Sequence, residues 1–538
     1  MKGMKPELLR SLQHYSKEKF VKDLVSGIIV AIIALPLSIA LALASGVSPE
    51  QGLYTAIVAG FVISALGGSK VQIAGPTAAF ATIVAGIVAK SGMDGLAAAT
   101  LMAGVILVIM GVCRMGSLIR FIPSTITAGF TAGIAVTILI GQLKDFLGLT
   151  FTHAPIETME KLKEVFATLG TLNYMALLVG CVALAILIFW PRVSKKIPAS
   201  LIAVVVTAAI VKLADLPVNT IGDLYTISSA PPAFHIPAIS FATVAEVLPD
   251  AFTIAILAAI ESLLSAVVAD DMIGARHDSN MELVGQGVGN AASALFGGIP
   301  ATGAIARTAA NINNGGVSTV AGMVHAVVLL LVLVLLMPYA ALIPMPCIAA
   351  ILFQVAYNMS GWRNVVKTVK IAPKSDTAVL VVTFLLTVIF DLVIAIVVGL
   401  TLACLLFMKR MADESHFTEW DYVREDDGRK KQVPDHVMVY EISGPMFFGA
   451  ADKIPHMENT DKKVLILRMT SVPAMDVTAL NALFRLQKEC QTCGIRIILS
   501  HVNPQPMSVL KKSGFVEAVG QENFVPNIDQ ALASCENL

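Results

Sequence analysis

Gly75-Pro76-Thr77-Ala78-Ala79-Phe80 and Gly297-Gly298-Ile299-Pro300-Ala301-Thr302-Gly303 are the two stretches of sequence that decide the fold. Each is too short and too rich in Gly, Pro and Thr for an ordinary membrane span, yet each lies among long hydrophobic segments. Pro76 and Pro300 are about 224 residues apart, and paired interruptions at corresponding places in two halves are typical of a transporter binding site.

The composition is that of a membrane protein. Of the 538 residues, 56% are hydrophobic and 14% are charged, and the mean hydropathy is +0.77. Soluble domains carry about 25% charged residues, which excludes a soluble chain. Because a membrane-spanning helix needs roughly 20 apolar residues, we predict an α-helical polytopic membrane protein. Its spans, about fourteen, lie near 23–43, 51–67, 76–90, 95–112, 121–143, 172–190, 198–213, 248–269, 282–297, 303–314, 318–337, 343–357, 376–391 and 392–408, the last two being one helix or two.

Basic residues are distributed unevenly, although the formal net charge is zero. They precede the first span and fall in alternate loops, and short basic loops stay in the cytoplasm. With an even number of spans both termini are then cytoplasmic, and the polar segment 1–22 is not a cleaved signal peptide. The residues are Lys2, Lys5, Arg10, Lys17, Lys19, Lys22, Lys70, Arg114, Arg120, Arg192, Lys195, Lys196, Arg363, Lys367, Lys370 and Lys374.

Further landmarks repeat at nearly the same offset. Pro123 and Pro344 each open a span and lie about 221 residues apart, while Pro36 and Glu261 lie about 225 apart, each thirteen residues into its span. A repeated unit of seven spans has its copies in opposite orientations, because an odd number of crossings inverts the second copy. The pattern therefore predicts a 7+7 inverted repeat, and the alternative is coincidence in apolar sequence of low complexity.

The composition changes again after the last span. A charged stretch is followed by short apolar runs at 437–442, 464–467 and 495–499, with helical periodicity at 477–490 between them. Strands that alternate with helices indicate a small α/β domain. The predicted organisation is a cytoplasmic segment 1–22, a transmembrane domain 23–410 with repeats of about 23–213 and 248–410, a linker 411–436 and an α/β domain 437–538.

The sequence favours neither an enzyme nor a metalloprotein. It has no Walker-type phosphate loop, no Gly-x-Ser-x-Gly elbow and no metal-like spacing of histidines. Cys490 and Cys493 form a single CxxC, which zinc would need to complete with two more ligands, so we interpret them as reduced thiols. We predict no cofactor, no metal and no nucleic-acid partner.

The two interruptions offer backbone chemistry for an anion. Amides at a helix start have no intrahelical partner and carry the positive end of the helix dipole. Two such starts facing each other would bind an anion with few charged side chains. The candidates are Thr77, Ala78, Ala79, Thr302 and Gly303. The alternative is a tightly packed interface of small residues.

Among the ionisable residues inside predicted spans, Arg307 and Glu261 are the candidates for function, because a charge there is expensive and normally has a partner or a cavity. Arg307 follows the second interruption and can hold an oxyanion; the alternative is a side chain that reaches the membrane surface. Glu261 shares a helix face with Ser265, and a carboxylate buried there takes up a proton or binds a cation. The pair predicts proton coupling, and the alternative is a purely structural ion pair.

At these residues the chain resembles the sulfate permease (SulP) family of anion transporters over nearly its whole length. The tail resembles a STAS domain through 464–467 and Val472-Pro473-Ala474-Met475-Asp476-Val477-Thr478-Ala479-Leu480. The membrane motifs that carry the resemblance are Pro36 with Gly52-Leu53-Tyr54, Gly75-Pro76-Thr77, Glu261-Ser262-Leu263-Leu264, Gly285-Gln286-Gly287-Val288-Gly289-Asn290, Phe296-Gly297-Gly298 and Ala306-Arg307-Thr308.

The resemblance implies a core domain and a gate domain, an elevator-like movement of the core, and a homodimer in the inner membrane of a bacterium. It places the anion between the third and tenth helices, near Thr77, Ala78, Ala79, Ala306 and Arg307. The resemblance extends to a proton-coupled branch that carries C4-dicarboxylates such as succinate, while sulfate is the usual substrate of the family.

Three departures from the family pattern bear on function. Many relatives carry Gln where this chain has Leu37, which removes a polar contact to substrate. Sodium-coupled bicarbonate relatives carry Asp and Thr where Glu261 and Ser265 stand, which favours protons over Na⁺. Phosphorylated STAS domains carry Ser where this chain has Val477, which argues against a phosphoswitch there.

The leading hypothesis is a proton-coupled secondary transporter of sulfate or a related small anion. The alternatives are a Na⁺-coupled bicarbonate transporter, an anion exchanger, channel or charge-moving membrane motor on the same scaffold, a nucleobase carrier, and a regulatory STAS module with the membrane part as its anchor. Membrane lipid and a cytoplasmic protein bound to the STAS domain complete the expected partners.

Overall fold

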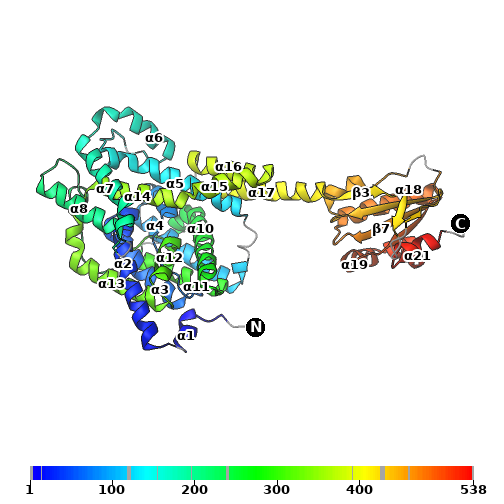
Figure 1. Ribbon diagram of the computed structural model, residues 1–538, viewed down its shortest axis with the longest axis horizontal. Coiled ribbons are helices and arrows are strands. Elements are labelled where there is room, and N and C mark those ends of the chain that lie inside the picture. Colours follow the sequence, from blue (N-terminus) through cyan, green and yellow to red (C-terminus); the bar gives the residue numbers. More distant parts are fainter. Residues whose placement is uncertain are drawn as a thin grey trace. The chain divides into compact units, whose positions relative to one another are not determined.

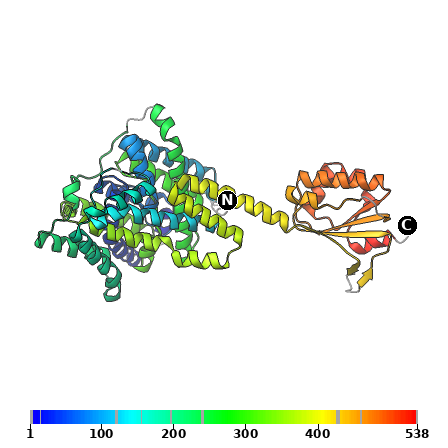
Figure 2. The ribbon, with the colours of Figure 1, turned by 90° about the horizontal axis from the view of Figure 1, so that it is seen from above.

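The computed structural model describes residues 4–13, 15–117, 123–153, 155–194, 197–237, 241–390, 392–424, 430–457 and 461–535. The chain forms two compact units, a helical one over 1–400 and an α/β one over 401–538, and each is described by itself (Figures 1 and 2). Of the residues named above, Lys2, Arg120, Lys195 and Lys196, with 425–429 of the predicted linker, lie outside the described residues.

One long helix in the first half of the helical unit, α4 (Ala81–Val112), is kinked. Gly92 has a positive φ of 67° inside α4 and divides it at a kink into two helical parts, as the separate spans 76–90 and 95–112 predict. The elements are α2 (Lys17–Ala44), α3 (Pro49–Leu66), β1 (Ala74–Gly75), η1 (Ala78–Phe80), α4 (Ala81–Val112), α5 (Ser124–Leu147), α7 (Tyr174–Val193) and α8 (Ala199–Leu213).

The second half repeats this order. The stretch 376–408, which sequence left as one helix or two, forms two helices. The elements are α10 (Phe241–Ile273), α11 (Ser279–Leu295), β2 (Thr302–Gly303), α12 (Ile305–Asn313), α13 (Val320–Ala340), α14 (Met345–Ser360), α16 (Lys374–Ile389) and α17 (Leu392–Asp413). Seven helices within the described ranges are long and apolar enough to cross a membrane, and the others are shorter or more polar.

Helices of each half pack against helices of the other half. Helix α4 packs against α10 and α11, while α13, its counterpart region, packs against α2 and α3. Strands β1 and β2 pair antiparallel, with Ala74 opposite Gly303 and Gly75 opposite Thr302. Copies that run in opposite directions give this antiparallel pair, so the structure supports the predicted inverted repeat.

One of the two proline pairs marks equivalent positions of the repeat, and the other does not. Pro123 and Pro344 both occupy the N-cap positions of their helices, α5 and α14. The superposition of Pro76 on Pro300 is wrong by three residues, because the equivalent N-cap positions are Thr77 and Ala304. Proline at a helix boundary is tolerated at several adjacent positions, so its position does not fix the register of a repeat.

The helices form two bundles. Helices α2, α3, α4 and α10 to α13 pack together, and α5 packs with α14 and α16, while α7 packs with α8 and α14. These bundles correspond to the core and gate domains that the family resemblance implies. The short elements that remain are α1 (Glu7–Leu12), α6 (Thr158–Ala167), η3 (Leu169–Thr171), α9 (Ile221–Leu224) and α15 (Trp362–Ile371).

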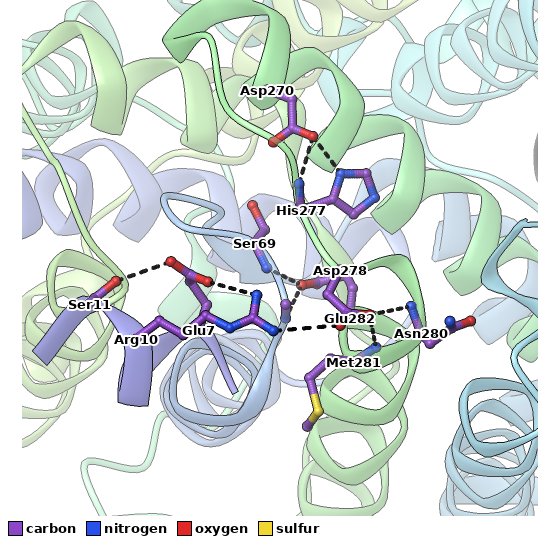
Figure 3. A network of polar contacts seen from close by, with 11 residues as sticks. Glu7, Arg10, Ser11, Ser69, Asp270, His277, Asp278, Asn280, Met281 and Glu282 are labelled. Carbon is purple, nitrogen blue, oxygen red and sulfur yellow. Dashed lines mark hydrogen bonds and ion pairs between the residues drawn. The ribbon is translucent and has the colours of Figure 1, made fainter. Parts of the chain in front are cut away.

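Hydrogen bonds fasten the turn that follows α3, from which the chain enters β1 (Figure 3). Glu282 Oε2 accepts bonds from the amides of Gly68 at 2.9 Å and Ser69 at 3.0 Å. The amide of Glu7 donates to the Gly67 carbonyl at 3.0 Å, so α1 is attached to the same turn. These bonds fix the segment that leads into the first interruption.

The α/β unit has a five-stranded sheet of order β3-β6-β7-β8-β9, with helices on both faces. Alternate side chains of β6 and β7 face α21 on one side, and α18, α19 and α20 on the other. Its elements are β3 (His416–Glu419), β4 (Tyr422–Arg424), β5 (Lys430–Gln432), β6 (Val437–Ser443), η4 (Phe448–Lys453), β7 (Val464–Ser471), α18 (Val477–Thr492), β8 (Arg496–Ser500), α19 (Pro504–Lys512), α20 (Phe515–Val519), η5 (Gln521–Asn523), β9 (Phe524–Val525) and α21 (Ile528–Ala533).

The predicted linker 411–436 is more ordered than its charge suggests. Helix α17 continues to Asp413, and β3 pairs antiparallel with β6 as an edge strand of the sheet. An edge strand buries little of its surface and can be rich in charge, so composition does not reveal it. Asp476 caps α18 by accepting a 2.9 Å bond from the Ala479 amide.

Candidate functional site

A cavity of about 340 Å³ lies where the two interruptions meet. It is lined by Pro76 to Ala79 at the start of η1 and α4, and by Gly303 to Arg307 at the start of α12. Both helix starts therefore open onto one cavity. Its lining is Leu37, Leu41, Pro76, Thr77, Ala78, Ala79, Phe130, Thr131, Glu261, Leu264, Gly303, Ala304, Ile305, Ala306, Arg307, Val355, Asn358 and Met359.

Two glycines allow the close approach of the interruptions. A Cβ on Gly75 would overlap the Nη1 atom of Arg307 and lie 3.2 Å from its Cζ. A Cβ on Gly303 would overlap the side-chain amide of Gln72. The amide of Gly303 donates to Ser262 Oγ at 3.1 Å, which attaches β2 to α10. Gly75 and Gly303 are thus needed for space beside their neighbours.

Arg307 lies in the first turn of α12 and is 1% exposed, although it lines the cavity. Its Nη2 donates to Ser38 Oγ and to the Pro76 carbonyl, both at 3.2 Å. Its Nε and Nη1 atoms have no hydrogen-bond partner among the described residues. The arginine therefore connects α2 with both interruptions and leaves two buried donor nitrogens unpaired.

Glu261 joins the two interruptions from α10. Its Oε2 accepts bonds from Thr77 Oγ1 at 3.1 Å and from Thr302 Oγ1 at 3.2 Å. No ion pair within 4.0 Å links Glu261 to Arg307 in the described part of the chain, so the structural ion pair considered from sequence is not formed. One carboxylate thus holds both helix starts through their threonines.

The structure brings most of the predicted site residues together. The cavity is lined by Thr77, Ala78, Ala79, Gly303, Ala306, Arg307 and Glu261. Thr302 does not line it but donates a hydrogen bond to Glu261, which does. Ser265 does not line it, because its hydroxyl lies 3.5 Å from Thr308 Oγ1 in the interior of the core bundle. The i, i+4 spacing places Ser265 on the face of Glu261 but one turn further along α10.

Sequence reasoning missed the part of the cavity that other helices supply. Phe130 and Thr131 come from α5, while Val355, Asn358 and Met359 come from α14. Ser38 holds Arg307, and its position two residues after Pro36 in an apolar run was an available signal. Among the described residues, no group of three or more His, Cys, Asp and Glu side chains is placed to hold a metal ion.

Comparison with known proteins gives the family. A profile of the Sulfate permease family matches residues 20–383, and a STAS domain profile matches 429–531. The chain belongs to the sulfate permease family. It is a multi-pass membrane transporter of anions, carries a C-terminal STAS domain, and is not an enzyme.

Several relatives match nearly the whole chain. It is 42% identical to the putative sulfate transporter YvdB of Bacillus subtilis, over 96% of this chain and 98% of that protein. It is 33% identical to the bicarbonate transporter BicA of Picosynechococcus sp., over 95% of this chain and 94% of that protein.

Solved structures share the fold. The murine Solute Carrier 26 family member A9 anion transporter, in its inward-facing state, aligns with a TM-score of 0.89 at 19% identity, over 100% of this chain and 94% of that one. The transmembrane domain of a cyanobacterial BicA aligns with a TM-score of 0.63 at 29% identity, over 72% of this chain and 98% of that one.

Proposed function

We propose that this sulfate permease family member is a proton-coupled secondary active transporter that carries a small anion, sulfate or a C4-dicarboxylate such as succinate. The observation that carries the proposal is the convergence of two helix starts, Arg307 and Glu261 on one cavity of about 340 Å³. Small-molecule sites have volumes of roughly 300 Å³ or more, so a small oxyanion fits.

The anion is held mainly by backbone groups in this proposal. The free amides at the starts of η1 and α12 carry partial positive charge, and the two starts act on the same volume. Arg307 adds a full charge, with two guanidinium nitrogens that have no partner among the described residues. The apolar lining from Leu37, Phe130 and Leu264 excludes water and strengthens these interactions.

Glu261 couples the anion to a proton. A charged carboxylate in the cavity repels an anion beside it, and a protonated carboxyl does not. Binding of a proton and binding of an anion therefore favour each other, as linkage requires. Because Glu261 also holds Thr77 and Thr302, its proton changes the contacts of both helix starts at once.

The proposed movement is of the elevator type. The core bundle supplies the helix starts, Arg307 and Glu261, while α5 and α14 of the gate bundle supply Phe130, Thr131, Val355, Asn358 and Met359. A core that slides along this mostly apolar gate surface would carry the anion past it. We also propose a homodimer in the plasma (inner) membrane of a bacterium, with both termini in the cytoplasm and a protein partner for the STAS domain.

Uptake into proteoliposomes tests the proposal. An inward proton gradient should drive accumulation of radiolabelled sulfate or succinate, and a panel of sulfate, bicarbonate, succinate, fumarate, aspartate and chloride should identify the best competitor. Glu261→Gln should abolish accumulation driven by the gradient. Glu246→Gln is the matched control, because Glu246 lies on the same helix in an exposed 3.6 Å ion pair with Lys90. Uptake indifferent to the pH gradient would refute the coupling.

A second candidate is Na⁺-coupled bicarbonate transport, which the 33% identity to BicA favours. In the same proteoliposomes, bicarbonate uptake that follows an imposed Na⁺ gradient and ignores the pH gradient would select this candidate. Unitary currents in a planar bilayer would instead select a channel.

A further inference from the structure

Helix α15 is amphipathic, with an exposed apolar face next to an exposed basic face. It occupies residues that the sequence marks only as a basic loop between two spans. Trp362, Val366 and Val369 follow i, i+4 and i+7 spacing, so they share one face, and their exposures are 47%, 43% and 40%. None of its residues is buried, although it packs along α5.

The second face of α15 is basic. Arg363, Lys367 and Lys370 follow the same i, i+4 and i+7 spacing, one step along the helix from the apolar residues. No carboxylate lies within 4.0 Å of these three side chains in the described part of the chain, and Arg363 stacks 5.6 Å from the Trp362 ring. The helix thus presents unpaired positive charge directly beside exposed apolar surface.

We propose that α15 lies in the membrane interface and binds anionic phospholipid headgroups. A helix with an apolar face and a Lys/Arg face lies in the plane of the interface, with its apolar side among the acyl chains. Basic clusters next to a span attract anionic headgroups. Trp is favoured at this depth, because its ring is apolar and its N–H is polar.

The corresponding helix of the other half provides an internal comparison. Helix α6 occupies the same place in the first repeat but carries Glu160 and Glu164 together with Lys161 and Lys163. Glu164 already accepts bonds from Thr152, at 2.8 Å from the amide and 2.6 Å from the hydroxyl. An inverted repeat places α6 and α15 on opposite membrane surfaces. Only the leaflet at α15 therefore meets an excess of positive charge from these two helices.

Fluorescence of Trp362 tests the proposal on the full chain. Replacing the other two tryptophans, W190F and W420F, leaves Trp362 as the reporter. The protein is placed in phosphatidylcholine nanodiscs that contain a small equal fraction of either brominated phosphatidylglycerol or brominated phosphatidylcholine. We expect brominated phosphatidylglycerol to quench Trp362 more strongly, because enrichment is on the order of fivefold for each basic side chain.

Variants of the two helices separate the proposal from general membrane effects. K367Q/K370Q should remove the preference for phosphatidylglycerol, while K367R/K370R and the matched α6 variant K161Q/K163Q should keep it. Equal quenching by the two lipids in the parent protein would overturn the proposal. So would a preference that survives in K367Q/K370Q, or one that is lost equally in K161Q/K163Q. The readout is independent of transport, so a failure here leaves the proposed function untouched.

Discussion

Gly75→Ala should displace Arg307 without unfolding the protein. The new Cβ would overlap Nη1 and lie 3.2 Å from Cζ, and its next neighbour is the Ala56 Cα at 3.7 Å. The side chain meets only the flexible end of an arginine, so the backbone is spared. The guanidinium must move away from β1, which breaks its bonds to Ser38 and to the Pro76 carbonyl.

The expected loss follows from these contacts. A hydrogen bond from a charged donor contributes about 1.5–3 kcal/mol, and the displaced guanidinium recovers part of this by new contacts. Two such bonds are lost and about half of their contribution is recovered, so we expect anion binding to weaken by about 1.5–3 kcal/mol, roughly 10- to 150-fold in Kd. The measurement is the half-saturating concentration for anion uptake, together with direct binding to the purified protein.

Gly86→Ala is the matched control for this change. Gly86 lies in α4 shortly after the same helix start, and a Cβ there would have no neighbour within 4 Å. A double-mutant cycle with Arg307→Lys then isolates the cause, because a lysine lacks the planar fork. If Gly75→Ala weakens binding as much in the Arg307→Lys background as in the wild type, or has no effect at all, the reasoning is wrong.

Three further predictions concern other parts of the chain. Glu261→Gln should keep anion affinity within a few-fold while losing accumulation driven by a pH gradient; a variant that still accumulates anion would contradict the role of Glu261. Ser38→Ala removes one acceptor of Arg307 and should weaken anion binding by roughly tenfold, which uptake titrations would reveal. Burial and the nearby charge of Glu489 raise the pKa of Cys490 to about 12, so its protonated thiol should resist maleimide at pH 7–8 while exposed Cys493 reacts. Rapid labelling of Cys490 in the folded protein, mapped by mass spectrometry, would count against this description of the domain.

The convergence of the two interruptions was predictable from sequence because its causes are local. Gly, Pro and Thr inside an apolar segment cannot continue a span, and a charged Arg307 beside them needs a cavity or a partner. Pro123 and Pro344 likewise mark helix starts by their own chemistry. These signals gave the helix order and most of the cavity that the core bundle supplies.

Other features depend on packing between distant segments and left no local pattern. Phe130 and Asn358 reach the cavity only because the gate bundle lies against the core. Phe130 resembles an ordinary residue of an apolar span, and Asn358 lies just beyond the end of the predicted span 343–357. Ser265 shares a face with Glu261 but lies one turn too far along α10. Strand β3 looked like a linker, because an edge strand tolerates the charges of a solvated segment.

A structure with selenate bound shows whether the two helix starts hold the anion together, because its anomalous signal locates a sulfate-like anion without ambiguity. We expect one peak in the cavity, within hydrogen-bond distance of backbone amides at both helix starts and beside the Arg307 guanidinium. A peak outside the cavity, or one that contacts only α12 and leaves the start of η1 untouched, would contradict the proposed site.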